Sequence, residues 1–485
     1  MAALDGVLPA LIGAAGAGGS VEVTNSLRFN PADSPTLSKT FGSAGDRRTW
    51  TYSCWVKRST NFNTYRHTLA SGPGTTLSFS ETAQGGANNW FFYVDATPYL
   101  LSDQVLRDVS AWYHAVFVFD TTNSTQADRC RVYKNGVRVT SFRNTAYPVQ
   151  DFEGNFNTAG VFKVGCGNSN EFLDGYMADV HFIDGQALDP TEFGAFDSDG
   201  VWQIAEYEGT YGGNGFRLAF DDSTNLGKDS SGNGNDFTAS NFSVTPGAGN
   251  DYLFDVPKNG DQSDTGAGGE VSSNYATWSA LVEQTSGGND ITNGGLDTSC
   301  GGPRTTTMSP FALKEKTYWE VVFGGGQTYN YVGMTEATGF NTVANNNSGI
   351  KYVGYKDYSY GWGGSDGNLY KNSNIIATPG TWGDGDVVGW AYDETNNVLK
   401  LYKNGSLVHT ENSIVDAEYF PAITHSSSGA TSSVNFGQRA YAHTAPTNHV
   451  AVCTNNLPTP TVSNGQTLKH LNQHRRPMLI VQQEL

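Results

Sequence analysis

The clearest pattern in the chain is a polar turn between two extended apolar runs, and it occurs twice. Tyr-Lys-Asn-Gly stands at residues 133–136 and again at 402–405, each time between alternating residues. Asn-Gly favours a two-residue type I′ turn, because both central residues then adopt a positive φ. The pattern therefore predicts two β-hairpins. The expected cross-strand neighbours are Val132 with Val139 in the first hairpin and Leu401 with Val408 in the second.

An apolar run that ends in aspartate precedes each hairpin, at residues 112–120 and 385–393. The same order of strand, aspartate turn and hairpin predicts two domains of similar topology. Residues 50–57 alternate strictly, which places Trp50, Tyr52, Cys54 and Val56 on one face of a strand. Strands that recur at intervals of roughly 8–12 residues with turn residues between them are typical of a β-sandwich.

We therefore predict an all-β chain with two antiparallel β-sandwich (jelly-roll) domains in tandem. Among 485 residues, 58 are glycine and only 16% are charged, which suits many tight turns between strands. The predicted order is an N-terminal docking arm at 1–24, a first sandwich at 25–220, a Gly/Asn/Asp-rich bridging segment at 221–270, a second sandwich at 271–455 and a C-terminal tail at 456–485.

The formal net charge of −18 argues against a nucleic-acid partner, which would require a basic surface to displace counterions from phosphate. Residues 1–19 are rich in Ala, Gly and Leu. No Lys or Arg precedes Arg28, so we expect no signal peptide, and Asp5, Pro9 and several glycines interrupt the run, so we expect no membrane insertion. A disordered tail would have this composition too. We favour an arm that becomes ordered against a partner.

The cysteines are far apart in the sequence and form no metal-binding motif. An odd number and the absence of Cys-x-x-Cys favour free, buried thiols in a protein made in a reducing cytoplasm. The five are Cys54, Cys130, Cys166, Cys300 and Cys453.

The sequence predicts no enzyme. Glycosidases of the jelly-roll type use two carboxylates that flank the scissile bond. The nearest pair here is Glu171 and Asp174, and Asp174 belongs to an Asp-Gly turn. His114 lies within a predicted strand, where a buried structural histidine is the simpler interpretation.

Calcium is the one cofactor that the sequence suggests. Asp221, Asp222, Asp229 and Asn233 lie in a glycine-rich stretch, and calcium takes six to eight oxygen ligands from such residues. The spacing does not match an EF-hand. Turns in which Asp and Asn bind their own backbone are the favoured alternative.

Exposed aromatic residues are the second candidate for ligand binding. Tyr355, Tyr358, Tyr360 and Trp362 stand among glycines in a loop without a clear strand pattern. Aromatic rings offer a large contact area at a low cost in conformational entropy. We predict that Tyr358, Tyr360 and Trp362 contact a glycan or protein ligand, with packing at the sandwich edge as the alternative.

Residues 25–200 resemble the laminin-G-like branch of the concanavalin-A-like lectin/glucanase jelly rolls. The resemblance rests on Trp-Tyr-His at 112–114, the first Tyr-Lys-Asn-Gly hairpin and the run Phe-Leu-Asp-Gly-Tyr-Met-Ala-Asp-Val at 172–180. It implies two antiparallel sheets, often with a rim that binds calcium or sugar.

The second domain resembles the SPRY (B30.2) domain, a β-sandwich that recognises proteins through its loops. The matching motifs are Tyr-Trp-Glu-Val at 318–321, Gly-Asp-Val-Val-Gly at 385–389, Leu-Tyr-Lys-Asn-Gly at 401–405 and Phe-Pro-Ala at 420–422.

The joined arrangement of residues 25–462 is similar to virion fibre or adhesin proteins of marine tailed bacteriophages. Motifs that carry it include Phe-Ile-Asp-Gly-Gln-Ala-Leu at 182–188 and Asp-Ser-Ser-Gly-Asn-Gly-Asn at 229–235. The resemblance implies a tail fibre or head-attached fibre that acts as a non-enzymatic adhesin for a host surface glycan or protein. It further implies a homotrimer that is made in the host cytoplasm and joins other virion proteins through its arm. The alternative is a jelly-roll carbohydrate-active enzyme, a glycan depolymerase.

Overall fold

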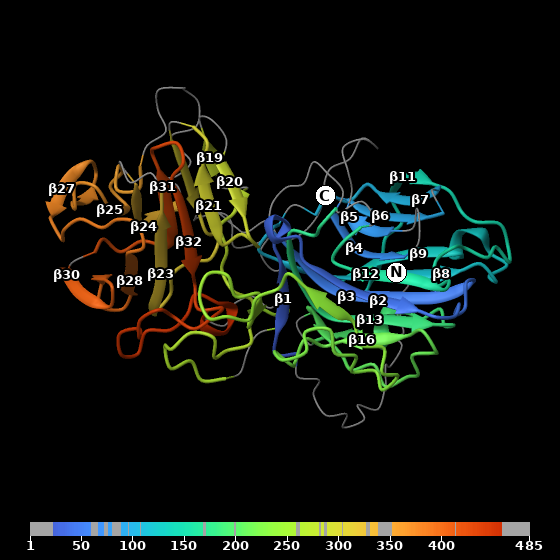
Figure 1. The fold of residues 1–485 in the computed structure, drawn as a ribbon. Coiled ribbons are helices and arrows are strands. Elements are labelled where there is room, and N and C mark those ends of the chain that lie inside the picture. The colour runs from blue at the N-terminus through green and yellow to red at the C-terminus, as the bar shows by residue number, and fades with distance from the viewer. Residues whose placement is uncertain are drawn as a thin grey trace, which may run out of the picture.

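The computed structural model describes residues 23–457 with short gaps, and these residues form strands, turns and a few 3₁₀ turns (Figure 1). The gaps are residues 60–65, 72–75, 80–88, 96, 107, 168–170, 198–199, 259–261, 281–282, 286–288, 303, 326–329, 338–351 and 413. The predicted docking arm and C-terminal tail therefore lie almost wholly outside the described residues. Within the described ranges, the chain has no helix with the length and apolar character that a membrane crossing requires.

Two antiparallel sheets form the first sandwich. One runs β10-β9-β8-β3-β13-β1-β18, with β16 also paired to β13, and the other runs β11-β7-β6-β5-β4-β12-β2-β17. The bounds of the first sheet are β1 Ser26–Phe29, β3 Thr49–Arg58, β8 Trp112–Asp120, β9 Cys130–Lys134, β10 Val137–Arg138, β13 Gly175–Asp184, β16 Phe216–Leu218 and β18 Tyr252–Leu253. Those of the second are β2 Thr36–Phe41, β4 Arg66–Ser71, β5 Thr76–Phe79, β6 Trp90–Val94, β7 Thr97–Ser102, β11 Phe142–Thr145, β12 Gly160–Val164 and β17 Thr238–Ser240.

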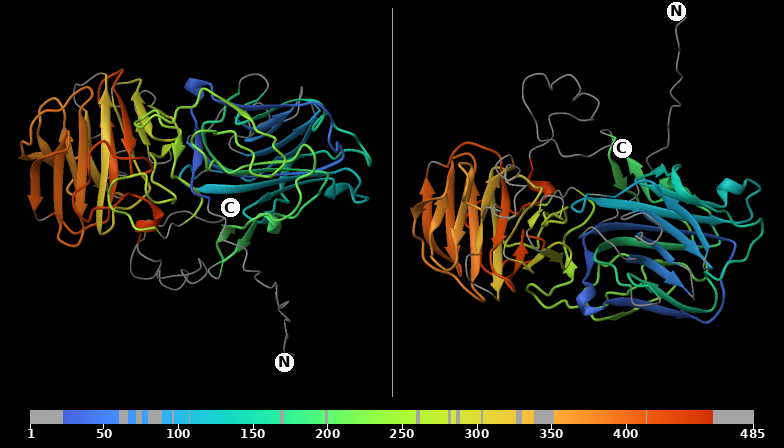
Figure 2. Two further views of the ribbon diagram at one scale, coloured as in Figure 1. Left: turned by 60° about the horizontal axis from the view of Figure 1, so that its bottom comes forward. Right: turned by 90° about the horizontal axis from the view of Figure 1, so that it is seen from above.

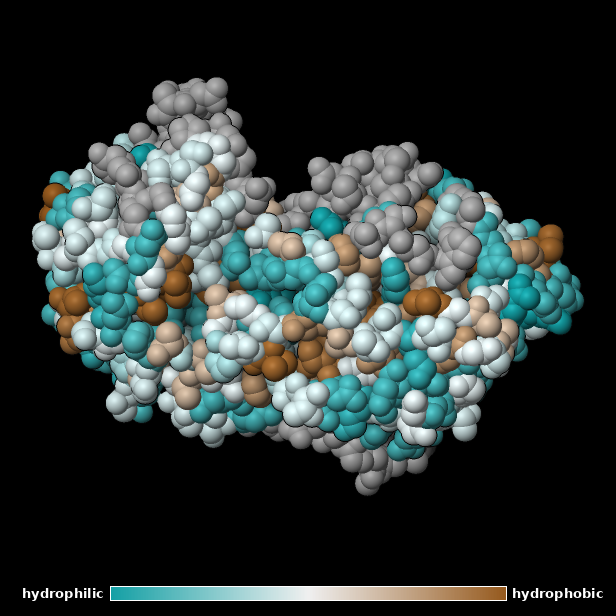
Figure 3. Space-filling model, viewed as in Figure 1, coloured by the Kyte–Doolittle hydropathy of each residue, from teal (hydrophilic) through white to brown (hydrophobic). Residues whose placement is uncertain are grey.

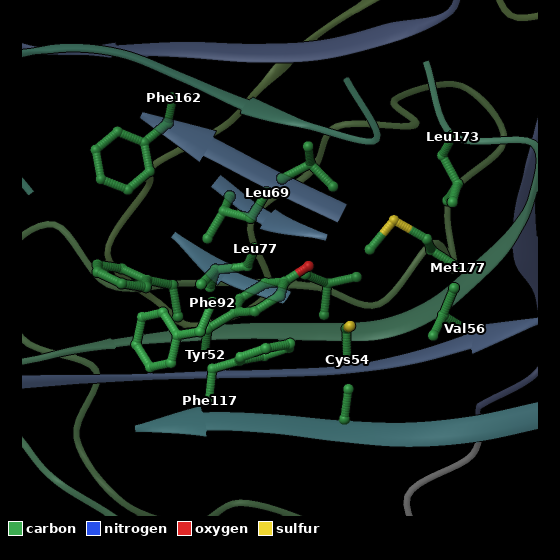
Figure 4. Close-up of a cluster of buried hydrophobic side chains, with 14 of the residues drawn as sticks. Tyr52, Cys54, Val56, Leu69, Leu77, Phe92, Phe117, Phe162, Leu173 and Met177 are labelled. Atoms are coloured by element: carbon green, nitrogen blue, oxygen red, sulfur yellow. The ribbon is translucent and has the colours of Figure 1, made fainter. Parts of the chain in front are cut away.

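A core of aromatic and aliphatic side chains lies between these sheets, as the alternation in residues 50–57 predicts. Tyr52, Cys54 and Val56 point from β3 toward Leu69 and Phe92 of the opposite sheet (Figure 4). Trp50 shares this core and stacks on Phe119 with ring centroids 5.2 Å apart.

Two further antiparallel sheets form the second sandwich, and among the described residues none of their strands pairs with a strand of the first (Figure 2). Their orders are β19-β22-β31-β24-β25-β26-β27 and β20-β21-β32-β23-β28-β29-β30. The first has β19 Glu283–Thr285, β22 Thr305–Met308, β24 Tyr331–Glu336, β25 Ser359–Gly363, β26 Leu369–Lys371, β27 Asn374–Ala377 and β31 Tyr419–His425. The second has β20 Asn289–Thr292, β21 Asp297–Cys300, β23 Lys316–Gly324, β28 Val387–Asp393, β29 Val398–Lys403, β30 Ser406–Asn412 and β32 Thr431–Asn435. The prediction of an all-β chain with two antiparallel sandwiches is confirmed.

The remaining elements are short. A two-stranded hairpin, β14 with β15, stands beside the first sandwich. Its strands are Gly194–Phe196 and Trp202–Ile204, and the 3₁₀ turns are η1 Pro31–Asp33, η2 Gln126–Asp128, η3 Pro190–Glu192 and η5 Thr454–Asn456.

Both predicted Asn-Gly turns are present. Asn135 and Gly136 have φ values of 47° and 77°, and Asn404 and Gly405 have 48° and 77°, as a type I′ turn requires. In the first hairpin the backbone amide of Val139 donates to the carbonyl of Val132 at 2.9 Å, so the predicted register is confirmed.

The predicted register is wrong in the second hairpin. Leu401 pairs with His409 rather than with Val408, because a bulge interrupts the pairing after the turn. Val408 is the extra residue. β30 is an outer strand of its sheet, where bulges are common because they disturb pairing with other chains.

The segment predicted as a bridge contributes strands to the first sandwich. Its β17 pairs with β2, and its β18 pairs with β1. The side chain of Arg28 on β1 forms a buried ion pair with Asp251 at 3.1 Å.

The two sandwiches are joined by an interface of buried polar and apolar side chains, which we call the waist. It includes Lys57, Trp112, Tyr176 and Asp255. Lys57 of β3 forms a buried ion pair with Asp255 at 2.8 Å, and the indole of Trp112 donates to the same carboxylate at 2.9 Å. The hydroxyl of Tyr176 donates to the carbonyl of Gly294 at 2.6 Å. These contacts join the outer face of the first sandwich to the chain that leads into the second.

Candidate recognition surface

Two of the three aromatic residues predicted to contact a ligand are buried. Tyr360 and Trp362 lie on β25 with exposed fractions of 1% and 0%, so the prediction that they are exposed loop residues is wrong. The indole of Trp362 donates to the carbonyl of Gly380 at 2.9 Å, inside the molecule. Tyr358, just before β25, is 43% exposed, and its role in binding stays a prediction.

Alternation along β25 explains this burial. Side chains at 360 and 362 point into the sandwich, while positions 361 and 363 face outward. Gly361 and Gly363 occupy the outward positions, and the cross-strand partner of Gly361 is Gly333 on β24. The outer face of this sheet therefore has a strip without side chains.

Another part of the chain fills that strip. Residues 352–358 lie across it, so a Cβ on Gly361 would overlap the carbonyl oxygen of Val353. The backbone amide of Val353 donates to the hydroxyl of Thr424 at 3.0 Å. The amide of Gly354 donates to the hydroxyl of Ser359 at 2.7 Å. The segment is thus held on the sheet by hydrogen bonds and by the missing side chains beneath it.

This segment brings together a cluster of four tyrosines, which we call the tyrosine face: Tyr331, Tyr352, Tyr355 and Tyr370. Tyr352 stacks on Tyr331 with centroids 4.4 Å apart and an interplanar angle of 19°. Tyr370 meets Tyr352 edge-on at 5.5 Å, and Tyr355 meets Tyr352 edge-on at 5.7 Å. Tyr331 is buried, while Tyr352, Tyr355 and Tyr370 are half-buried. Their rings form a partly open aromatic surface on a rigid sheet.

Polar groups surround these rings. The guanidinium of Arg304 lies 5.8 Å from the centroid of Tyr352, and the ammonium of Lys356 lies 5.9 Å from that of Tyr355. The hydroxyl of Tyr370 donates to the carboxylate of Asp366 at 2.6 Å. Burial, together with this carboxylate, raises the pKa of Tyr370, so its hydroxyl remains protonated at neutral pH.

The sequence pattern pointed to the wrong residues of this region. The predicted contacts on β25 point inward, and Tyr331, Tyr352 and Tyr370 were not among the predicted residues. The signal that could have found them is the glycine at every second position of residues 361–363, which indicates that backbone approaches that face of the strand.

The side chains of the four residues predicted as calcium ligands bind other protein groups, in their own loop and in the nearby segment 212–217. Both carboxylate oxygens of Asp229 accept hydrogen bonds, from the amides of Arg217, Ser231 and Asn235 and from the Ser231 hydroxyl. Asp222 accepts from Thr224, and the side-chain amide of Asn233 donates to the carbonyls of Gly212 and Gly215. Asp221 lies 4.0 Å from the ammonium of Lys228. In the part of the chain that the structure describes, no three His, Cys, Asp or Glu residues form a group suited to a metal ion.

Ser53 and His114 are a pair of the kind that could serve as nucleophile and base; Thr298 and His425 form another, with the hydroxyl 2.8 Å from Nε2. The serine hydroxyl lies 2.8 Å from Nε2 of His114, and the indole of Trp202 donates to Nδ1 at 2.9 Å. Burial lowers the pKa of His114 to about 3, so the ring is neutral. Because Nδ1 accepts the hydrogen bond from Trp202, the single ring proton lies on Nε2. Nε2 must then donate to the serine, and it cannot accept the serine proton. The pair is a buried structural contact, as expected for His114.

All five cysteines are free and buried, as the sequence predicts. Burial raises the pKa of Cys54 to about 12 and that of Cys166 to about 11, so both thiols are protonated and unreactive at neutral pH.

Comparison with known families supports the two resemblances. Residues 32–193 match the model of the concanavalin A-like lectin/glucanases superfamily, and residues 316–439 match that of the SPRY domain. No curated protein matches the chain.

Solved structures that resemble this one include the SPRY domain of human HERC1, with 16% identity and a TM-score of 0.28 over 32% of this chain and 96% of that chain. The TRIM65 PSpry domain has 14% identity and a TM-score of 0.27 over 33% of this chain and 89% of that chain. Stonustoxin has 13% identity and a TM-score of 0.25 over 33% of this chain and 27% of that chain.

Proposed function

We propose that this protein is a structural protein of a tailed-bacteriophage virion, a tail fibre or head-attached fibre that acts as a passive adhesin. It binds a glycan or protein on the host surface and cleaves no bond. The observation that carries the proposal is the tyrosine face, a partly open aromatic surface held on a rigid sheet. Such surfaces suit recognition because little conformational entropy is lost on binding.

Two further observations support a binding role. The chain combines a concanavalin A-like domain with a SPRY domain, and both are compatible with binding. In the buried pair of Ser53 and His114 the imidazole carries its proton on Nε2, so it cannot accept the serine proton as a general base would. The similarity of motifs along residues 25–462 to phage fibres supplies the virion setting.

The assembly part of the proposal concerns the N-terminal arm. Residues 1–19 anchor the protein to other virion proteins, and three copies associate, by analogy with phage fibres. Deletion of residues 1–19 should leave a folded protein that no longer joins particles. Normal incorporation of the truncated protein would show that the arm is not the anchor.

The decisive experiment tests whether the protein is present on the phage particle and whether it binds the host cell. Antibodies against the purified chain should label virions of the phage that encodes it, as seen by electron microscopy, and should slow adsorption. The purified chain should bind susceptible cells and release no reducing sugar from their polysaccharide. Unlabelled virions would refute the virion assignment, and sugar release would establish the depolymerase alternative.

A further inference from the structure

We infer that the tyrosine face binds a neutral, hexose-containing glycan. This inference rests on the proposed adhesin function and names the ligand of the same surface. The tyrosine face belongs to the second sandwich, which the family comparison matches to the SPRY domain, and not to the lectin-like first sandwich.

The position of the tyrosine face on its sheet determines how a ligand can be held. The strands beneath it, β24, β25 and β26, are interior strands of a seven-stranded sheet. Their backbone amides and carbonyls are engaged by neighbouring strands. An extended peptide therefore cannot bind here by adding a strand, which requires an open edge. The ligand must be held by side chains.

The exposed side chains combine aromatic rings with hydrogen-bonding groups. Half-buried Tyr352, Tyr355 and Tyr370 provide apolar ring surface. Asp366 and Asn368 stand beside the hydroxyl of Tyr370, with the Asn368 amide 3.4 Å from it. A hexose ring has one face of C–H groups and a rim of hydroxyls that both donate and accept. Rings for the apolar face and a carboxylate and an amide for the hydroxyls match this chemistry.

The charges next to the rings favour a neutral ligand. Arg304 and Lys356 are positive and Asp366 is negative, so opposite charges are mixed within one small surface. The whole chain carries a formal net charge of −18, which repels polyanions at longer range. An acidic polysaccharide would gain little from such a surface. A neutral glycan is not repelled by the net charge of the chain.

Binding of defined oligosaccharides by the full-length chain tests the inference. Neutral hexose oligomers of glucose, galactose and mannose are compared with uronic acid oligomers of equal length by calorimetry. The test variant is Tyr352→Ala with Tyr355→Ala, which removes two half-buried rings of the tyrosine face and leaves buried Tyr331 in place. The control is Phe196→Ala, a 54% exposed aromatic residue on the β14–β15 hairpin of the first domain.

We expect at least one neutral oligomer to bind, and the double variant to weaken its binding at least tenfold with an unchanged melting temperature. The control should bind like the wild type. Binding to uronic acid oligomers alone, to none of the oligomers, or equally by the double variant would overturn the inference. If the double variant melts earlier, Tyr355→Ala alone replaces it, with the same criterion of weaker binding.

Cells treated with periodate, which oxidises sugar diols, separate this inference from the adhesin function. Loss of cell binding after treatment supports both. Binding that survives treatment leaves the adhesin function intact and refutes the glycan as its receptor. Binding to an oligomer without binding to cells refutes the adhesin function alone.

Discussion

The two Tyr-Lys-Asn-Gly hairpins share a local structure but end in different surroundings. In the first, the Oδ1 of Asn135 accepts the amide of His114 at 2.8 Å. In the second, the Oδ1 of Asn404 accepts the amide of Val387 at the same distance. In both hairpins the asparagine side chain thus bonds the turn to the strand that precedes the hairpin, which is β8 in the first domain and β28 in the second. Four residues are enough to repeat the turn and its anchor in two domains.

The strand after the turn differs between the two hairpins. In the first hairpin the ring of Trp202 covers Gly136, and β10 is only two residues long. In the second, β30 has seven residues. The strand after the turn begins with an exposed apolar side chain in both hairpins, with Val137 at 59% and Leu407 at 52%. Figure 3 shows apolar surface at the end of the second sandwich, where β27 and β30 lie. The turn is thus set locally, whereas the length of the next strand depends on the segments that pack against it.

The same contrast holds for whole sheets. Along β3 of the first sandwich nearly every residue is buried, because the waist and residues 185–220 cover the face that is not in the core. The outer face of the β19–β27 sheet carries the half-buried tyrosine face. We therefore expect substitutions to affect the two sandwiches differently, with the largest effect at the waist.

Asp255→Ala should destabilise the protein most, by about 3–5 kcal/mol, because it removes the carboxylate that balances the buried charge of Lys57. The remaining hydrogen-bond partners of Lys57, Asn274 and the carbonyl of Tyr275, are neutral. The free energy of unfolding in denaturant measures this loss. Glu153→Ala is the control, because it breaks an exposed ion pair with Arg48 and should cost about 1 kcal/mol or less. Equal losses in the two variants would show that the waist is not a stabilising interface.

Acid should act on buried histidines in both sandwiches, among them His114 in the first and His425 in the second; burial also lowers the pKa of His67 in the first sandwich to about 4. Burial lowers the pKa of His114 to about 3, with Asp179 and His181 acting in opposite directions, and burial lowers that of His425 to about 4. Above pH 6.5 His114 and His425 are neutral in both the folded and the unfolded protein. Between pH 6.5 and the folded pKa, each histidine binds a proton in the unfolded protein only. The free energy of unfolding should fall by about 1.4 kcal/mol per pH unit for each histidine between pH 6.5 and its folded pKa.

Unfolding of the wild type, His114→Gln and His425→Gln at pH 7 and pH 5 tests this. Each substitution should reduce the loss between the two pH values. Variants that lose as much stability as the wild type would show that these histidines do not cause the acid sensitivity.

Gly136→Ala should cost more than Gly405→Ala. Both positions have a φ of 77°, where an alanine costs roughly 1–2 kcal/mol. A Cβ on Gly136 would also overlap the buried ring of Trp202, whereas one on Gly405 would lie 2.8 Å from the ring of His443, which is half-buried and can move. Melting temperatures of the two variants measure the difference. A reversed order would mean that Trp202 moves more readily than His443.

The smallest expected effect is the difference in stability between the variants Asn404→Asp and Asn135→Asp. Both keep the acceptor oxygen, and Asp tolerates a positive φ. The amide of Asn404 also donates to Asp386 at 2.8 Å, so Asn404→Asp replaces that bond with repulsion between carboxylates. We expect a loss of about 0.5–1 kcal/mol for Asn404→Asp only, since like-charge neighbours cost amounts of this order. High salt should reduce the loss, and a loss that is independent of salt would contradict the repulsion.

The sequence by itself determined the turns and the alternating strands. Asn-Gly places two residues at positive φ without help from the rest of the chain, and the period of two along residues 50–57 selects one face for the core. These features depend on residues that are adjacent in the sequence. The all-β class and the two separate sandwiches could therefore be predicted.

Only the tertiary structure decided which aromatic rings reach the surface. Alternation states that Tyr360 and Trp362 share a face, but not whether that face meets solvent or the other sheet. The tyrosine face exists because Gly333 and Gly361, 28 residues apart, meet on neighbouring strands and leave room for a third segment. The Val408 bulge is likewise set by the edge of its sheet. Contacts between distant residues depend on which strands become neighbours, and alternation along one strand does not specify its neighbours; the glycines at 361 and 363 indicate only that backbone approaches that face, not which segment covers it.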